Sequence, residues 1–125
     1  MINLDKNNEA LDLSYLKEMS GDSAEFIIEM IDLFKSQTPL YIEELQQAID
    51  AEDWTRVAGV AHKIKPSFVY VGREDAKAHM QMIEDNAGSK QNLEALPEAY
   101  AEIVAFTTVL YKQLDEAKAV LEKQL

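Results

Sequence analysis

The chain has 125 residues, of which 12 are Lys or Arg and 23 are Asp or Glu, so its formal net charge at pH 7 is −11. This length predicts a single domain over residues 1–125, with a core within about residues 12–123. So strong a negative charge argues against nucleic acid as a partner, because phosphate backbones attract basic surfaces. The absence of Cys excludes disulfides and thiolate chemistry, and a hydrophobic content of 47% indicates a folded domain.

The beginning of the chain carries no targeting signal that we can identify. Residues 1–5 contain no basic segment, and no long apolar run follows them. A secretory signal or a membrane-spanning helix needs such a run. We therefore expect a cytoplasmic protein that has no membrane partner.

The first predicted element is a short helix near the N-terminus. Leu13, Leu16 and Met19 have the three-residue spacing of one helical face, and Gly21 is a natural stop. We expect this helix to cover one end of the core.

A long helix is predicted over residues 26–49. Asp22 or Ser23 is a suitable N-cap. Pro39 removes a backbone hydrogen bond inside this segment, but the apolar spacing continues through it, so we expect one long kinked helix. Its apolar positions are Ile27, Ile31, Phe34, Tyr41, Ile42, Leu45 and Ile49.

Two further helices are predicted in the middle of the chain. The first starts after Asp53 and ends at Gly72, and the second opens at Asp75 and ends at Gly88. Their apolar faces are Val57, Val60, Ala61, Ile64, Phe68 and Val71 in the first, and Ala76, Met80, Ile83 and Ala87 in the second.

A polar loop over residues 88–92 precedes the last predicted helix, which runs from near Pro97 to the C-terminus. The four long amphipathic helices, with no strand pattern, predict an all-α fold: an antiparallel four-helix bundle with a short additional N-terminal helix. These apolar faces are used within one bundle, so we expect a monomer. The face of the last helix is formed by Ala99, Ile103, Phe106, Leu110, Leu114, Ala117 and Leu121.

His62 lies off the apolar face of its helix, roughly 140° from Val57 at 100° per residue. A single helical histidine is most often inert, but its neighbours on the same face are small or compact. Gly59 costs roughly 1 kcal/mol relative to Ala inside a helix, which suggests that another protein approaches closely. Pro66 leaves the His62 carbonyl without its intrahelical partner. The other apolar neighbours, Ala58 and Val69, together with Pro66, predict the apolar centre of a docking surface.

The segment around His62 is also basic within an acidic chain. Residues 54–73 contain no Asp or Glu. Lys65 lies one helical turn from His62, and Lys63 flanks it, so a dianionic group on the imidazole has positive charge nearby. The four basic residues of the segment are Arg56, Lys63, Lys65 and Arg73.

Residues 61–68, with the sequence AHKIKPSF, and Gly72 ten residues after His62 together resemble the signature of histidine-containing phosphotransfer (HPt) domains. The resemblance implies a four-helix bundle whose exposed histidine accepts a phosphoryl group from the phospho-aspartate of a receiver domain and passes it to another receiver. The implied partners are receiver domains of response regulators or of a hybrid sensor kinase. The implied Mg²⁺ belongs to the receiver, and no cofactor or metal belongs to this chain.

The same resemblance assigns roles to residues of this chain. His62 is the implied phosphoacceptor, and Lys65, with Lys63 nearby, stabilises the phosphoryl charge. Ser67 and Gly72 support the local packing, and Pro66 stands where Gly is more common. In this family a Gln or Glu often lies twenty-two residues after the histidine, and here that residue is Glu84. A carboxylate that accepts a hydrogen bond from Nδ1 leaves Nε2 as the free nucleophile.

Three other functions compete with this one, of which a catalytic phosphatase is the most remote because no second base is placed to activate water at His62. A di-iron bundle needs paired Glu-x-x-His segments, and two histidines without such a repeat do not provide the ligands. A helical-bundle scaffold that binds a partner and never carries phosphate remains the alternative. The chain has no Gly-rich phosphate loop, so we expect a phosphocarrier that is not an enzyme and does not bind ATP. His79 is predicted to be structural.

Overall fold

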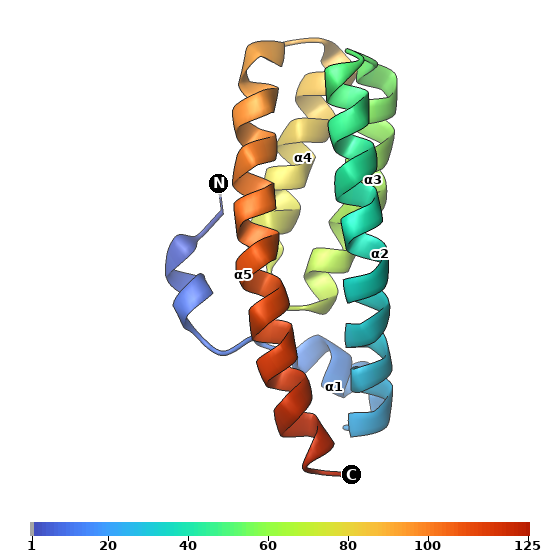
Figure 1. Cartoon of the computed structure of the whole chain (residues 1–125), viewed down its shortest axis with the longest axis vertical. Helices are drawn as coiled ribbons and strands as arrows, with labels where there is room; N and C mark the ends of the chain where they lie inside the picture. Colours follow the sequence, from blue (N-terminus) through green and yellow to red (C-terminus); the bar gives the residue numbers. More distant parts are fainter. Residues whose placement is uncertain (1) are drawn as a thin grey trace.

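A computed structural model describes residues 2–125 and contains helices but no strands in that part of the chain (Figure 1). Four long helices form an antiparallel bundle, and a short helix precedes them, which confirms the predicted fold class. The α-helices are α1 (Ser14–Ser20), α2 (Ala24–Asp50), α3 (Trp54–Tyr70), α4 (Glu74–Ser89) and α5 (Leu96–Glu122), with 3₁₀ turns η1 (Leu4–Asn8) and η2 (Leu93–Ala95).

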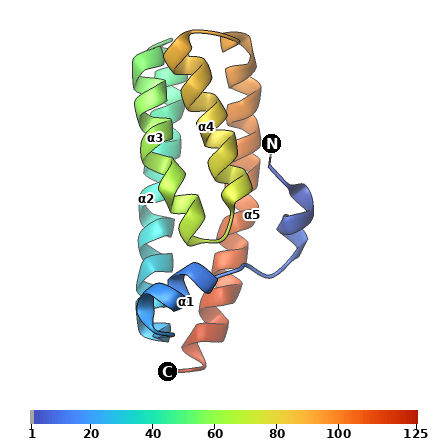
Figure 2. The same ribbon diagram turned by 180° about the vertical axis from the view of Figure 1, so that it is seen from behind.

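The four long helices form a closed ring of neighbours. Helix α3 packs against α2 and α4, and α5 packs against the same two helices from the other side. Helices α3 and α5 therefore lie diagonally across the bundle. Helix α1 lies across the lower end, below the turn that joins α3 to α4 (Figure 2). One surface of α3 is consequently open beside α4 and above α1.

The core between the helices contains a chain of aromatic rings. Phe68 of α3 packs edge-to-face against Phe34 of α2 and Phe106 of α5, with centroid distances of 6.1 and 5.6 Å. Phe68 and Phe106 are almost completely buried. Such edge-to-face pairs add to the free energy gained by burying apolar surface. They hold α3, and with it the surface that carries His62, in a fixed position.

The helix ends largely agree with their predicted positions. The side chains of Ser23 and Asp53 accept hydrogen bonds from the N–H groups of Phe26 and Arg56, each at 3.2 Å, so both are N-caps. Helix α2 continues through Pro39.

Some details of the prediction were wrong. Helix α3 ends at Tyr70, two residues before the predicted Gly72. Helix α4 does not stop at Gly88 but continues to Ser89, because Lys90 adopts the left-handed conformation, with φ of 57°, that ends the helix. Met19, predicted to lie on the buried face of α1, is 49% exposed. This helix has only two turns, and they bury Leu16.

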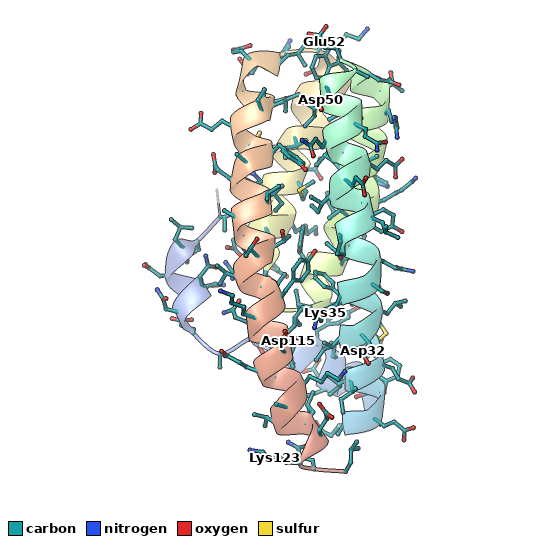
Figure 3. All side chains as sticks on the ribbon, in the orientation of Figure 1. Asp32, Lys35, Asp50, Glu52, Asp115 and Lys123 are labelled. Atoms are coloured by element: carbon teal, nitrogen blue, oxygen red, sulfur yellow. The ribbon has the colours of Figure 1, made fainter. Side chains whose placement is uncertain are left out.

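Polar side chains link the two longest helices at their surface. Lys35 of α2 pairs with Asp115 of α5, and Figure 3 shows these two side chains facing each other. Lys118 of α5 pairs with Asp32 of α2 at 2.8 Å. Such exposed pairs contribute little stability individually. All four charged side chains belong to α2 and α5, and none of them belongs to α3.

Arg73, at the start of α4, holds the N-terminal arm against the bundle. Its buried guanidinium donates to both carboxylate oxygens of Asp75, to the Asn7 side chain and to the Asn3 carbonyl, and it stacks on Phe106 at 4.6 Å. Burial alone would raise the pKa of Asp75, but hydrogen bonds from Arg73 and from the Asn3 N–H lower it to about 2. The arm runs beside α5 (Figure 1). Composition and periodicity gave no sign of this contact.

Among the helices of the described residues, none is long and apolar enough to cross a membrane.

Gly72 and Gly59 provide a matched pair of stability tests. Gly72 has φ of +75°, and a Cβ there would lie 2.2 Å from the Asp12 carbonyl oxygen, whereas a Cβ at Gly59 meets nothing within 4 Å. We predict that Gly72→Ala lowers the free energy of unfolding by at least about 2 kcal/mol, because it combines backbone strain with a steric clash. Gly59→Ala should raise it by up to about 1 kcal/mol through helix propensity. Urea unfolding measures both changes, and an equal effect of the two substitutions would contradict the packing role of Gly72.

Candidate functional site

His62 lies on the open surface of α3 and its side chain is 70% exposed. Helix α3 continues through Pro66, so the imidazole projects from regular helix and not from a break. Gly59, one turn before it, is exposed and Ala58 is half-buried. These small residues leave the ring standing above a low surface, as the sequence predicted.

Glu84 of α4 reaches His62 across the groove between α3 and α4. Its Oε2 lies 3.1 Å from Nδ1 of His62. A carboxylate only accepts hydrogen bonds, so this contact assigns the ring proton to Nδ1. Nε2 then keeps its lone pair and points away from the carboxylate. The structure therefore brings together the two residues that the twenty-two-residue spacing had suggested.

Glu84 is held in its ionised form. Burial in the groove would by itself raise its pKa, but hydrogen bonds from Lys65 and His62 and the positive charge of Lys65 outweigh burial and lower the pKa below its ordinary value. The carboxylate consequently stays charged, and stays a hydrogen-bond acceptor for His62, into the acidic range.

Lys65 lies within the groove between α3 and α4, with only 13% of its side chain exposed. Its Nζ is 2.7 Å from Oε1 of Glu84 and donates to Oε1 of Gln81 at 2.6 Å. Gln81 in turn donates from Nε2 to Asp85 at 2.8 Å. Lys65 is thus engaged with two acceptors of α4. Lys63 is exposed on the other flank of His62.

Two other predicted residues lie away from the imidazole. Ser67 is half-buried and lines a small cavity between α2 and α3, beside Phe34 and Thr38. Gly72 forms the turn between α3 and α4, against the backbone of Asp12. Both placements favour a role in packing.

A shallow hollow adjoins His62 on the side of α1. Its volume is about 320 Å³, and two of the residues that line it, Tyr15 and Tyr70, have their rings in contact with a centroid distance of 5.4 Å. The two tyrosines and Lys77 were not predicted from the sequence as residues of the site. The helical spacing contained a signal for one of them, because Tyr70 lies one turn after Pro66 on the same face. The hollow is lined by Tyr15, His62, Lys65, Pro66, Val69, Tyr70 and Lys77.

The second histidine is part of the core, as predicted. His79 is 2% exposed, and its Nε2 lies 2.9 Å from the Ala99 carbonyl oxygen, to which it donates. This hydrogen bond ties α4 to α5. Within residues 2–125 no group of three or more metal-ligating side chains is gathered in one place.

Comparisons with known proteins agree with this geometry. The sequence matches the family model described as Hpt domain over residues 29–122. The fold is similar to the crystal structure of the HPT domain of a sensor hybrid histidine kinase from Shewanella, with a TM-score of 0.60, 18% identity and 92% of each chain covered. No curated protein matches the sequence. The family match spans most of the chain and confirms the resemblance seen around His62, so this protein belongs to the Hpt domains, the phosphotransfer modules of phosphorelays.

Proposed function

We propose that this domain carries a phosphoryl group on Nε2 of His62, received from the phospho-aspartate of one receiver domain and passed to another. The observation that carries the proposal is the contact between His62 Nδ1 and the Glu84 carboxylate, on a ring that is 70% exposed. It supplies a nucleophile whose tautomer is fixed before the partner arrives.

In the transfer, one bond to phosphorus forms as another breaks, and His62 and the receiver's aspartate supply both groups. The Nε2 lone pair of His62 forms the N–P bond while the P–O bond to the aspartyl oxygen breaks, and that electron pair leaves with the receiver's carboxylate. The imidazole keeps its Nδ1 proton and gains positive charge as the bond forms. The Glu84 carboxylate, 3.1 Å from Nδ1, stabilises this charge. The return transfer reverses each step.

The domain supplies few other groups, because phosphoryl transfer depends mainly on positioning and on electrostatic stabilisation. Lys65 and Lys63 bring positive charge to the phosphoryl oxygens. The aspartate and the Mg²⁺ belong to the receiver. We therefore infer a phosphocarrier with no cofactor of its own and no reaction with ATP.

The docking surface that we propose surrounds the imidazole. Ala58, Pro66 and Val69 form its apolar part, and Gly59 allows the partner's backbone to come close. The hollow beside them adds Tyr15 and Lys77. Elsewhere the chain is strongly acidic, whereas residues 54–73 contain no acid, so the surface around His62 repels an acidic partner less than the rest of the domain does.

The cellular setting follows the same proposal. We infer a monomeric cytoplasmic domain, spanning residues 1–125, whose donor is a hybrid sensor kinase or a response regulator. Nothing in the sequence favours nucleic acid or a membrane as an additional partner.

The proposed phosphoacceptor, His62, can be tested directly. Purified protein incubated with a phosphorylated receiver and Mg²⁺ should gain one phosphoryl group, seen by intact mass as an acid-labile and alkali-stable adduct. His62→Gln should gain none, because the nucleophile is absent, while its circular dichroism and unfolding transition stay unchanged, because the side chain is exposed.

Phosphorylation of the His62→Gln variant would contradict the assignment of the phosphoacceptor. No gain by the wild type with several receivers would favour a scaffold that binds without carrying phosphate.

The proposed docking surface can be tested at Val69. Val69→Asp should lower kcat/KM for transfer from a receiver about tenfold or more, because it places an unpaired charge at the centre of an apolar contact. Phosphorylation of His62 by the small reagent phosphoramidate, which needs no docking, should be unchanged.

Val104→Asp is the matched control. Val69 is half-buried and Val104 is 37% exposed, but Val104 lies on α5, diagonally across the bundle from α3. This variant should transfer at the wild-type rate. Equal losses in both variants would show that the effect is one of general charge and would remove the docking surface from α3.

A further inference from the structure

The ammonium group of Lys65 is shared between two acceptors that differ in charge. The Glu84 carboxylate lies 2.7 Å away, and the neutral amide oxygen of Gln81 lies 2.6 Å away. With 13% of its side chain exposed, Lys65 has little access to water. Any move of the ammonium toward another anion must therefore break the contact with Gln81, with Glu84, or with both.

Gln81 is itself oriented. Its Nε2 donates to Asp85 at 2.8 Å, one turn further along α4. Exchange of the amide oxygen and nitrogen would place an N–H group against the ammonium and an oxygen against a carboxylate. The two hydrogen bonds therefore define one orientation, in which the acceptor oxygen of Gln81 faces Lys65.

Transfer of the phosphoryl group changes the partners that Lys65 and Glu84 need. Before transfer the His62 ring is neutral, and Lys65 is the cation that neutralises Glu84. After transfer the ring is positive while it keeps its Nδ1 proton, so it becomes the counter-ion of Glu84. The phosphoryl group adds negative charge beside Lys65. After transfer, the hydrogen bond to Gln81 is the interaction that still keeps Lys65 in its original position.

We infer that Gln81 is a positioning residue that holds Lys65 on α4 in the unphosphorylated domain and competes with the phosphoryl group for its ammonium. This inference rests on the proposed function. Gln81 does not touch the reacting atoms but stabilises the state before transfer relative to the state after it. It thereby sets the equilibrium between phospho-receiver and phospho-His62, and so the ease with which the group moves onward.

Substitutions of Gln81 should shift this equilibrium in opposite directions. Gln81→Leu removes the acceptor and releases Lys65, so the equilibrium constant for transfer to His62 should rise about threefold to tenfold, which lies within the net range for one ordinary intramolecular hydrogen bond. Gln81→Glu replaces it with an anion that holds Lys65 more strongly, so the constant should fall by a similar or larger factor. A role in folding alone would not reverse sign between these variants.

The experiment uses the whole domain with a phosphorylated receiver and Mg²⁺, and measures the fractions of both phosphoproteins at equilibrium. Each Gln81 variant is compared with the wild type. Gln81→Leu is also made together with Lys65→Met, where its effect should disappear because the residue through which it acts is absent. Circular dichroism confirms that each variant is folded.

The outcomes separate this inference from the proposed function. If the wild type takes up phosphate and Gln81→Leu leaves the equilibrium unchanged, or shifts it equally with Lys65→Met present, Gln81 does not act through Lys65 and this inference is overturned alone. If the wild type takes up no phosphate from any receiver, both are overturned.

Discussion

The function proposed for this domain depends on one carboxylate shared by two donors. Glu84 accepts a hydrogen bond from the Nδ1–H group of His62 on one oxygen and pairs with Lys65 through the other. The first contact fixes the tautomer of the ring, and the second keeps the carboxylate ionised, which the lowered pKa of Glu84 reflects. A protonated Glu84 would no longer form the ion pair with Lys65 and would be a weaker hydrogen-bond acceptor for His62. In the proposed mechanism, the group that orients the exposed histidine therefore comes from the neighbouring helix α4 and not from α3.

That dependence makes the relative position of α3 and α4 the main structural requirement. The two helices meet at a turn in which Gly72 passes so close to Asp12 that no side chain fits. Immediately after Gly72, the guanidinium of Arg73 donates hydrogen bonds to Asp75 and to the N-terminal arm, and it stacks on the ring of Phe106. At its middle, α4 is tied to α5 by His79. These contacts keep the groove between α3 and α4 at the width that a His–Glu hydrogen bond needs.

Much of this arrangement could be predicted from the sequence, for physical reasons. Apolar spacing identified the long helices, and Ser23 and Asp53 marked helix starts because caps are local interactions. Pairing of His62 with Glu84 was suggested by resemblance and required the structure to show it. The contact of Arg73 with the N-terminal arm joins residues about seventy positions apart, and no periodicity reports such a contact. The hydrogen bond between Lys65 and Gln81 was not predicted, because the sequence does not distinguish a glutamine that binds a neighbouring helix from one that is solvated.

The most direct test of the central claim is to locate the phosphoryl group on the imidazole. Domain labelled with ¹⁵N in histidine, phosphorylated by a receiver, is examined by ³¹P and ¹⁵N NMR. The account predicts a one-bond phosphorus coupling to Nε2 of His62, with the proton on Nδ1, because Glu84 occupies the Nδ1 side of the ring. A coupling to Nδ1, or phosphate on His79 or on any other residue, would contradict the claim that Glu84 directs the chemistry to Nε2.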